Sequence, residues 1–508
     1  PVLTGGLAAA AALPGLRFPF LSDDWAQVEA AGSVWPPWHT PFADFRPLYM
    51  ASLWLDRQIA GLSPAFFHLT NVMLIALAAF LVVVVVRRYT GDARIATGAG
   101  LLFALHPYHV ENAAWIAARS DPLYAVPLLL AALAYDRWRD RRRGLPLAAL
   151  ALFESALLAK EMAIVLPVAL ILIGALDRKR RPDVGEWTRG LAPLLLLAVL
   201  HFALLRPWAL GGPGRTLLGG FGSAWIAHGL GYAAAAILPA DVEILTAHPV
   251  PWGAGALFVL GLLLVMARLR SGAIPRPALA AMPLFAVLLI PALVGFQERY
   301  LFLPSAASAL ALAALLRAAR GRVAAGLSLV LASFLIAASV MQWSDWRQAA
   351  LASDRLVEDL VRAGRRPGVR EIVVANMPFR VRGGSVAGDF QAALALSDGR
   401  PLPVRAAAYI SYASAGSDAL DGTPGTALRS PPPFAEVWVR VPHAPFSHYV
   451  GPLPPGGGPG QEATQVLESA TGTLVFDGRG GVRIRIPPSG DGGRAAYAWV
   501  GGRLRPLF

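Results

Sequence analysis

Apolar runs of about 15 to 20 residues fill the first two thirds of the chain, and clusters of basic residues separate them. Runs of this length are typical of helices that cross a lipid bilayer, whose hydrocarbon core is about 30 Å thick. They lie at 2–20, 66–86, 95–108, 122–135, 145–159, 162–176, 189–205, 252–267, 278–295, 300–316 and 323–341. The pattern predicts an all-α membrane protein with about eleven transmembrane helices, the first of them a true helix rather than a cleaved signal.

One further apolar segment, 223–240, is ambiguous. Counting it as a full span would invert every later loop and move the later basic clusters to the other side of the membrane. Its small residues from Ala233 to Ala236, followed by Pro239, are typical of a short element that packs on other helices. We therefore interpret it as an interfacial or re-entrant helix.

The basic residues between the runs predict the orientation of the chain. Alternate loops carry nineteen of them: Arg87, Arg88, Arg94, Arg137, Arg139, Arg141, Arg142, Arg143, Arg178, Lys179, Arg180, Arg181, Arg189, Arg268, Arg270, Arg276, Arg317, Arg320 and Arg322. The opposite loops between residues 106 and 300 carry only Arg119, Lys160, Arg206, Arg215 and Arg299. Because loops rich in Lys and Arg stay in the cytoplasm, the richer set is predicted to be cytoplasmic.

Composition excludes several classes of protein. Of 508 residues, 56% are hydrophobic and only 15% are charged, against about 25% charged in soluble domains. The mean hydropathy of +0.52 leaves no polar faces to cover a large soluble core. The formal net charge of +13 lies in short loops rather than in a stripe that would follow nucleic acid. Cysteine is absent, which excludes disulfides, thiol catalysis and cysteine metal sites.

Two regions have a different pattern, and they divide the predicted membrane domain, 1–341, from the rest. Residues 21–65 form a first external loop whose Trp-rich, amphipathic sequence predicts interfacial helices. Residues 342–365 predict an amphipathic linker helix. Residues 366–508 predict a β-rich domain outside the cytoplasm, with strand-like runs at 371–375, 403–412, 436–441, 473–476 and 481–486 between Gly and Pro turns.

Charged residues at membrane depth are costly and are usually functional. The topology places five groups of them on the non-cytoplasmic side: Asp23 and Asp24; His106, His109, Glu111, Arg119 and Asp121; Lys160 and Glu161; Asp241, Glu243 and His248; and Glu298, Arg299 and Tyr300. The Arg-rich loops on the other side are interpreted as orientation signals only.

Each group has a structural and a functional interpretation. Asp23 and Asp24 are either a solvated or helix-capping pair, or a general base with a second carboxylate that orients it. His106, His109 and Glu111 resemble metal ligands, but without a fourth ligand hydrogen bonding to a phosphate or a sugar hydroxyl is favoured. We therefore expect no cofactor, with a divalent metal as the weaker alternative.

The cations have two interpretations as well. Lys160 beside Glu161, and Glu298 beside Arg299, are either structural ion pairs or parts of a phosphate site. Together Lys160, Arg299 and Arg119 supply the charge to bind a phosphate or pyrophosphate. Such a set suits a reaction on a phosphate-linked substrate held at the membrane surface.

Several of these residues lie in recognisable motifs. His106 to Asp121 (HPYHVENAAWIAARSD) resembles the HPxHxExVxxIxxRxD segment of transmembrane O-mannosyltransferases that carry tetratricopeptide repeats, and of their bacterial relatives. Residues 157–161 (LLAKE), 298–305 (ERYLFLPS) and 22–25 (SDDW) resemble three further elements of these proteins, and 343–347 (WSDWR) lies where they leave the last span. The chain thus resembles the C-type polytopic glycosyltransferases (GT-C) over residues 20–350.

The resemblance implies an inverting transfer of a sugar from a polyprenyl-phosphate donor to an acceptor hydroxyl at the extracytoplasmic membrane face. Asp23 or Asp24 would be the base, and the first acid of such a pair is the one favoured. Lys160 and Arg299 would hold the lipid phosphate, with Arg119 as a third candidate. The residues His106, His109, Glu111, Asp121, Glu161, Glu298 and Tyr300 would shape the site. A bacterial cytoplasmic-membrane location with the C-terminal domain in the periplasm is implied too.

The C-terminal region departs from the family, because it is β-rich where the relatives carry tetratricopeptide helices. The sugar and the acceptor, a protein or a glycolipid, therefore cannot be carried over. A non-catalytic membrane subunit that anchors or stabilises a membrane-protein complex is the main alternative. A transporter is disfavoured because the charges gather at one face and no half-to-half repeat is present.

Overall fold

The computed structural model describes the chain except for a set of short segments. These are 142–143, 175–183, 211–222, 239–244, 246–248, 294–296, 320, 382–383, 387, 413–425, 430–434, 441–448, 451–465, 470–471, 477–480, 487–492, 501 and 508. The chain divides into two compact units. The first comprises Pro1–Phe18 and Ala30–Trp343, and the second comprises Pro19–Glu29 and Ser344–Phe508.

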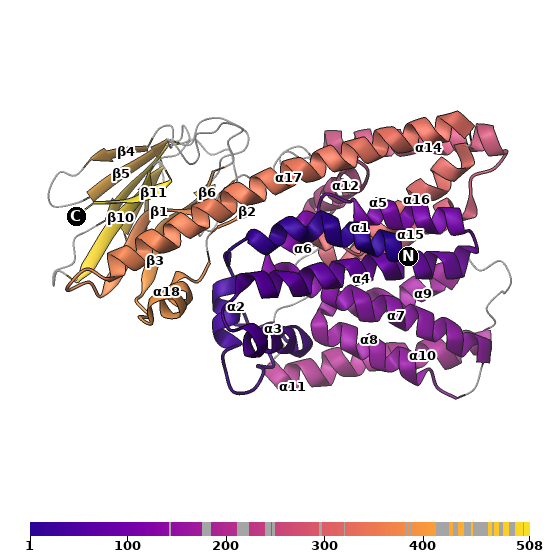
Figure 1. Cartoon of the computed structure of the whole chain (residues 1–508), viewed down its shortest axis with the longest axis horizontal. Helices are drawn as coiled ribbons and strands as arrows, with labels where there is room; N and C mark the ends of the chain where they lie inside the picture. The colour runs from indigo at the N-terminus through magenta and orange to yellow at the C-terminus, as the bar shows by residue number, and fades with distance from the viewer. Residues whose placement is uncertain are drawn as a thin grey trace. The chain divides into compact units, whose positions relative to one another are not determined.

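The first unit is a bundle of helices (Figure 1). In chain order they are α1 (Val2–Ala12), η1 (Leu13–Arg17), α3 (Pro47–Ala60), α4 (Pro64–Thr90), α5 (Ala93–Ala104), α6 (His109–Ala114), η2 (Ile116–Arg119), α7 (Ser120–Arg141), α8 (Leu147–Ala159), η3 (Glu161–Val165), α9 (Leu166–Gly174), α10 (Val184–Leu200), η4 (His201–Leu205), α11 (Arg206–Leu210), α12 (Ser223–Ile237), α14 (Pro249–Ser271), α15 (Arg276–Leu289), η5 (Ile290–Ala292), η6 (Glu298–Leu301), α16 (Pro304–Ala319) and α17 (Gly321–Gly364).

Every predicted apolar run overlaps helical structure among the described residues. Among the described residues five helices are long and apolar enough to cross a membrane, and seven shorter apolar helices accompany them. The five are Pro64–Thr90, Ile116–Arg141, Thr188–Leu210, Pro249–Ser271 and Gly321–Gly364. The chain is thus an integral multi-pass membrane protein, while the number of eleven spans stays a prediction.

Two polar levels bound the apolar part of α4 and α7. At one level Arg119, just before α7, donates to Asn71 in the first turns of α4 at 2.6 Å. At the other level Arg88 of α4 pairs with Asp136 of α7 at 2.5 Å. Seventeen residues of α4 separate Asn71 from Arg88, which at 1.5 Å per residue is about 25 Å. This spacing is close to the thickness of a bilayer core of about 30 Å, so the two levels fit its two faces.

The Arg88 contact also groups two of the Arg-rich loops. Arg88 reaches Asp140 as well, at 2.8 Å, so the loop after α4 and the loop after α7 lie at the same end of the bundle. The motif residues around Arg119 lie at the opposite end of the same two helices. Which end faces the cytoplasm stays a prediction. Arg142, Arg143, Arg178, Lys179, Arg180, Arg181, Arg215 and Arg320 lie outside the described residues.

The ambiguous segment 223–240 contains α12, which packs on α14. A side chain at Gly253 of α14 would come within 2.7 Å of Leu230 Cβ, so the small residue allows the close approach. Whether α12 spans the membrane stays open. The predicted charged group Asp241, Glu243 and His248 lies outside the described residues.

The second unit contains two sheets, which confirms a β-rich C-terminal region (Figure 1). The first sheet has the order β11-β10-β1-β3-β6, with β2 paired to β1, and the second has the order β4-β5-β9-β8-β7. Their bounds are β1 (Glu371–Val381), β2 (Gly384–Ser385), β3 (Val404–Tyr412), β4 (Thr426–Arg429), β5 (Ala435–Arg440), β6 (Tyr449–Val450), β7 (Val466–Ser469), β8 (Gly472–Phe476), β9 (Gly481–Ile486), β10 (Arg494–Val500) and β11 (Arg503–Pro506).

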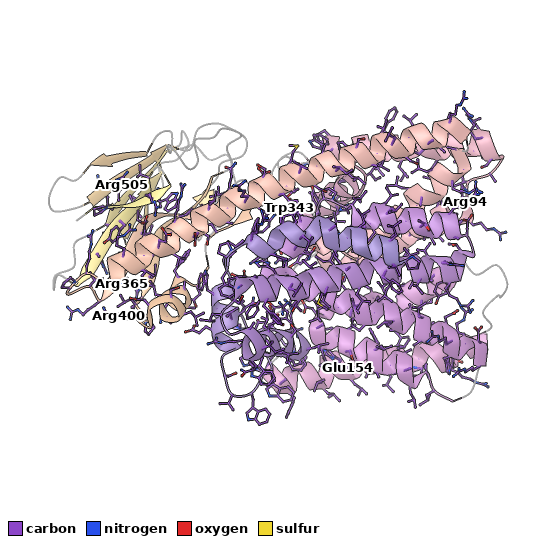
Figure 2. All side chains as sticks on the ribbon, viewed as in Figure 1. Arg94, Glu154, Trp343, Arg365, Arg400 and Arg505 are labelled. Carbon is purple, nitrogen blue, oxygen red and sulfur yellow. The ribbon has the colours of Figure 1, made fainter. Side chains whose placement is uncertain are left out.

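The first sheet is organised around β1, which is parallel to both β3 and β10. The helix α18 (Phe390–Asp398) makes the crossover from β1 to β3, as parallel pairing requires. The core of the unit joins β1, β10, α18 and the later turns of α17, and Trp499 is almost fully enclosed there. Arg365, Arg400 and Arg505 lie at the surface (Figure 2).

The predicted last span and the predicted linker helix form one continuous helix, α17. The sequence pattern changes within it, from an apolar stretch to one with an apolar stripe. Leu356 and Leu360, one turn apart on that stripe, are fully buried in the core of the second unit. No helix-breaking residue separates the two stretches, which explains why the helix continues.

Candidate functional site

A buried ion pair joins two of the predicted groups in the first unit. Lys160 lies between α8 and η3, where its extended backbone interrupts the helix. Its Nζ contacts both carboxylate oxygens of Asp121, at 2.6 and 2.7 Å. Burial lowers the pKa of Lys160 to about 8, against the opposing effect of Asp121, and the charges of Arg46 and Arg299 lower it further.

Arg299 brings a third motif to the same place. Its Nη1 donates to Glu111 Oε1 at 2.9 Å, and its backbone N–H donates to Glu111 Oε2 at 2.7 Å. Arg299 Nε lies 4.0 Å from Asp121 Oδ2, so Lys160 and Arg299 share one carboxylate. Burial alone would lower the pKa of Arg299, but Glu111 and, to a smaller extent, Tyr300 and Asp121 outweigh it and raise that pKa.

Aromatic rings cover these two cations. Lys160 Nζ lies 4.6 Å from the centre of the Tyr300 ring, and the Arg299 guanidinium lies 4.5 Å from the Trp115 ring and 5.3 Å from Tyr300. Cations over ring faces gain electrostatic energy and are shielded from water. Burial raises the pKa of Tyr300, so this hydroxyl stays protonated at neutral pH.

Glu161 does not pair with its neighbour Lys160, because Arg46 holds it. Arg46 Nη2 and Nε donate to the two carboxylate oxygens of Glu161 at 2.6 and 3.0 Å. Arg46 immediately precedes α3, in the loop that the sequence identifies only as amphipathic. Nothing in its local sequence marks it as part of this site; only the pairing across more than a hundred residues does so.

Arg119 is fully enclosed by partners of its own. Its guanidinium contacts Asp56 Oδ2 at 2.6 Å, and it donates to Asn71 Oδ1 and to the Phe67 carbonyl at 2.6 Å each. The residue has 0% exposure. These contacts tie α3, α4 and α7 together and favour a structural role for Arg119.

His106 and His109 lie side by side, buried at the same end of the helix bundle as these ion pairs. The ring centres of His106 and His109 are 5.3 Å apart. Ser305 donates its hydroxyl hydrogen to the Phe302 carbonyl at 2.7 Å, so its oxygen accepts from His109 Nε2 at 3.1 Å. Burial lowers the pKa of His109, so this imidazole stays neutral.

The remaining predicted residue of this end, Glu298, begins η6 and accepts a hydrogen bond from Gln342 Nε2 at 3.1 Å. Among the described residues, no three His, Asp or Glu side chains gather closely enough to hold a metal ion. The site of the first unit is therefore a set of ion pairs and buried imidazoles.

The acid pair belongs to the second unit, and its two members differ. Asp24 is fully buried, and its Oδ2 accepts from the Leu21 backbone N–H at 2.9 Å, so it holds the turn before α2 (Asp24–Ala30). Asp23 is only half-buried, with Ser22 Oγ at 3.4 Å from its Oδ1. Asp23 is thus the more accessible carboxylate. That it meets the cations of the first unit stays a prediction.

The bundle contains a further pair, between His201 and Glu154, that the sequence does not predict. His201 Nδ1 lies 2.8 Å from Glu154 Oε1, and so η4 contacts α8 through this pair. Glu154 is labelled in Figure 2. His201 begins a π-helical turn, which widens the helix and turns its side chain toward α8. Glu154 and His201 each lie alone within a long apolar run, so no sequence motif identifies either residue.

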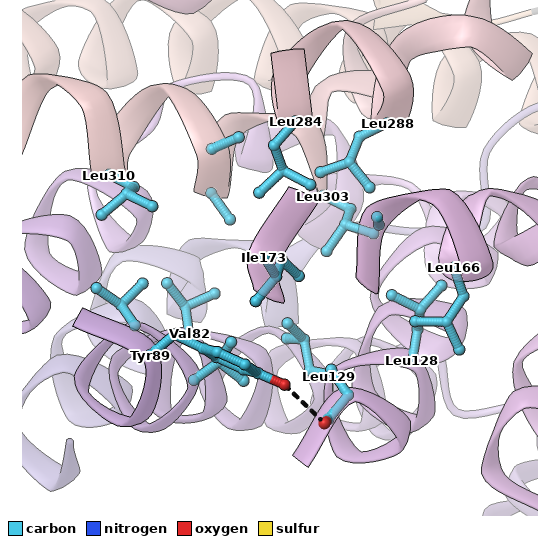
Figure 3. Close-up of a pocket in the computed structure, with 16 residues that line it drawn as sticks. Val82, Tyr89, Leu128, Leu129, Leu166, Ile173, Leu284, Leu288, Leu303 and Leu310 are labelled. Atoms are coloured by element: carbon cyan, nitrogen blue, oxygen red, sulfur yellow. Dashed lines mark hydrogen bonds between the residues drawn. The ribbon is translucent and has the colours of Figure 1, made fainter. Parts of the chain in front are cut away.

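The bundle also contains an apolar pocket. Residues of α4, α7, α9, α15 and α16 line it, and Tyr89 donates to the Ala132 carbonyl at its rim (Figure 3). None of its lining residues is charged, so the pocket offers no group for acid–base chemistry.

Fold and site together define a polytopic helical membrane protein with four ion pairs gathered where its helices end. No protein-family model matches the sequence. The chain is 38% identical over 147 residues to protein O-mannosyl-transferase Tmtc1 of Drosophila melanogaster, and 33% identical over 128 residues to human protein O-mannosyl-transferase TMTC1. The predicted resemblance to transmembrane O-mannosyltransferases is thereby confirmed.

These matches are partial. The one to Drosophila Tmtc1 covers 28% of this chain and 17% of that protein, and the one to human TMTC1 covers 24% and 13%. A crystal structure of ArnT from Cupriavidus metallidurans bound to undecaprenyl phosphate aligns with 79% of this chain and 85% of that chain. Its TM-score of 0.38 at 16% identity is too low to indicate a shared site.

Proposed function

We propose that the protein is an inverting glycosyltransferase that moves a sugar from a polyprenyl-phosphate donor to an acceptor hydroxyl. The observation that carries the proposal is the shared contact of Lys160 and Arg299 with Asp121. The partial sequence similarity to protein O-mannosyl-transferases supports it.

Lys160 and Arg299 suit the phosphate because both are held in place before any ligand arrives. Buried cations with carboxylate partners need little rearrangement when charge develops nearby, and such preorganised charge stabilises a leaving group well. A phosphate can replace Asp121 as their shared anion, and the planar guanidinium of Arg299 suits two of its oxygens. Arg119 already uses its donors on Asp56, Asn71 and Phe67, so we assign it no phosphate contact.

Asp23 is the proposed base. It would take the proton of the acceptor hydroxyl while the acceptor oxygen forms a bond to the anomeric carbon of the sugar. The bond from that carbon to the phosphate oxygen breaks on the opposite face, and the polyprenyl phosphate leaves with the electron pair. Asp24 serves this step indirectly, since its bond to the Leu21 N–H fixes the turn that presents Asp23.

The test is transfer of labelled sugar from a panel of polyprenyl-phosphate donors by protein in liposomes. Arg299→Gln is expected to weaken donor binding and transfer about 100-fold. The matched control is Arg88→Gln, which breaks an arginine–carboxylate pair at the other polar level and should leave transfer near wild type. Equal losses in both variants would argue against a phosphate role for Arg299.

The acid pair is tested in the same assay. Asp23→Asn is expected to abolish transfer while donor binding persists, because only the proton acceptor is removed. Asp24→Asn should reduce transfer through the loosened turn. Full activity in both variants and in the double variant would refute the base assignment.

Two further parts of the proposal concern place and partners. By the Arg count, the reaction takes place on the extracytoplasmic side of the membrane. The family resemblance implies a bacterial inner membrane, with the second unit in the periplasm. The acceptor is a protein or a glycolipid. If no donor in a broad panel supports transfer, the alternative of a non-catalytic subunit in a membrane-protein complex is favoured instead.

A further inference from the structure

The segment that carries the acid pair folds with the C-terminal sequence. Pro19–Glu29 and Ser344–Phe508 form one compact unit, although more than three hundred residues separate them. Trp25 packs against the core made by α17, β1, α18 and β10, and its ring also lies edge-on to Phe20 at 5.2 Å. The β-rich region, which has no motif of the related enzymes, thus provides the surface on which this segment folds.

The closest contact is between two backbones. Gly388, in the connection between β2 and α18, lies against Ser22, the residue just before the acid pair. A Cβ at position 388 would be 2.0 Å from the Ser22 carbonyl oxygen and 2.5 Å from its Cα. Because these are main-chain atoms, no change of side-chain rotamer could relieve the clash, so the approach requires glycine.

The Ser22 backbone is itself held in an unfavourable conformation. Its φ is +48°, in the left-handed region that residues other than glycine rarely adopt. Such a conformation persists only where the surroundings enforce it. On one side Asp24 fastens the turn through Leu21 N–H, and on the other Gly388 closes on it. The direction of Asp23, the next residue, follows from this turn.

We propose that the second unit positions the acid pair, with Gly388 as the positioning residue that fixes the Ser22 turn and hence the Asp23 carboxylate. The proposal rests on Asp23 being the base of the proposed transfer reaction. It assigns a task to the β-rich region, which is to hold the segment that carries the acid pair.

Gly388→Ala is the first test. The added methyl must displace the turn, and a shift of about 1 Å at a reacting group costs about 100-fold in rate. We expect kcat to fall by about this factor with the donor KM unchanged. The matched control is Gly399→Ala at the end of α18, where φ is +69° and nothing lies within 4 Å, so it strains the same unit without touching Ser22.

Hydrogen exchange tests the same contact without any turnover. The amides of Asp24 and Gln27 donate to Leu21 and Asp23 carbonyls at 2.8 and 3.1 Å. In Gly388→Ala they should exchange at least about tenfold faster than in wild type or Gly399→Ala. Trp25→Ala, which removes a contact and adds no atom, should act in the same direction if Gly388→Ala does not fold.

The outcomes separate the two proposals. Unchanged exchange in Gly388→Ala and Trp25→Ala would overturn the positioning role, as would a loss of transfer that appears only as a raised donor KM. If wild-type protein transfers no sugar, the proposed function fails, while faster exchange at Asp24 and Gln27 would still support the hold of the second unit on this segment.

Discussion

The ammonium of Lys160 is bound by both carboxylate oxygens of Asp121, at 2.6 and 2.7 Å, where each side chain is almost completely buried. Two adjacent acidic and basic residues in the sequence, Lys160 and Glu161, therefore have separate partners from other helices. A buried pair of this kind contributes little net stability compared with apolar residues of the same size.

Removing the carboxylate of this pair should be costly. Asp121→Asn leaves the Lys160 ammonium buried without its counter-charge, which typically destabilises a protein by about 3–5 kcal/mol. The double variant Lys160→Met with Asp121→Asn should recover much of this loss, because neither charge then remains. Thermal unfolding of the purified variants measures both effects. A single variant as stable as wild type would contradict the pairing.

Donor binding should depend on pH through Lys160. Its pKa of about 8 means that the ammonium loses its proton as the pH rises past that value. Affinity for polyprenyl phosphate should then fall by up to about tenfold per pH unit above pH 8 if only the charged form binds. Lys160→Arg, which stays charged, should show no such fall. Equal pH profiles for the two proteins would exclude Lys160 from the phosphate site.

Folding stability should rise with pH through Lys160, whereas donor affinity should fall. Between pH 8 and the ordinary lysine pKa of 10.5 the unfolded chain binds a proton that the folded chain has lost. The contribution of Lys160 to the free energy of unfolding therefore rises with pH across this window. Comparing the pH dependence of unfolding in wild type and Lys160→Met isolates this contribution, and a fall with pH would contradict the lowered pKa.

The stability and activity of a His106→Leu variant should show whether the buried His106 imidazole serves the reaction or only packing. Both of its ring nitrogens are enclosed without a hydrogen-bond partner among the described residues. His106→Leu should therefore gain about 1–3 kcal/mol of stability, while His109→Leu deprives Ser305 of its donor and should lose stability. If His106 serves the reaction, the stabilised variant transfers no sugar. A destabilised His106→Leu protein would contradict this account.

Arg119 should behave as a structural residue. Arg119→Lys cannot satisfy Asp56, Asn71 and Phe67 together, and we expect a loss of about 3–5 kcal/mol in stability. The folded fraction should bind polyprenyl phosphate as wild type does. Arg299→Lys is the contrasting variant, with weaker phosphate binding and a smaller loss of stability. A specific loss of phosphate affinity in Arg119→Lys would contradict this assignment and indicate that Arg119 binds the phosphate.

The helices of the first unit could be predicted from the sequence because long apolar runs have few alternatives. The contact of Arg88 with Asp136 places the ends of α4 and α7, where two of the Arg-rich loops begin, on the same side of the bundle. The grouping of the other Arg-rich loops stays a prediction. The second unit was harder: the five predicted runs are strands, but α18 and the strand pair β10 and β11 were missed. Their short, mixed sequences gain their structure from tertiary contacts: β10 pairs in parallel with β1, β11 pairs antiparallel with β10, and α18 packs in the same core.

In the candidate site, too, the sequence predicted the residues but not their tertiary contacts. Motifs identified Lys160, Arg299, Glu111 and Asp121, because ionisable residues stand out in apolar surroundings. Their pairing could not be predicted, since adjacency in sequence favoured Lys160 with Glu161. Arg46 and Asp56 were missed because they lie in a polar loop and on an amphipathic helix, where charge is ordinary.

The distance of about 25 Å between the polar levels of α4 and α7 also sets how the protein relates to its lipids. It is a few ångströms shorter than an average bilayer core of about 30 Å, so the surrounding lipid must thin or the polar side chains must extend outward. Either adjustment costs free energy that increases with acyl-chain length. The charged end that holds Lys160 and Arg299 would then lie slightly below the level of the lipid headgroups, at a depth where a phosphate on a long hydrocarbon tail can reach it without leaving the membrane.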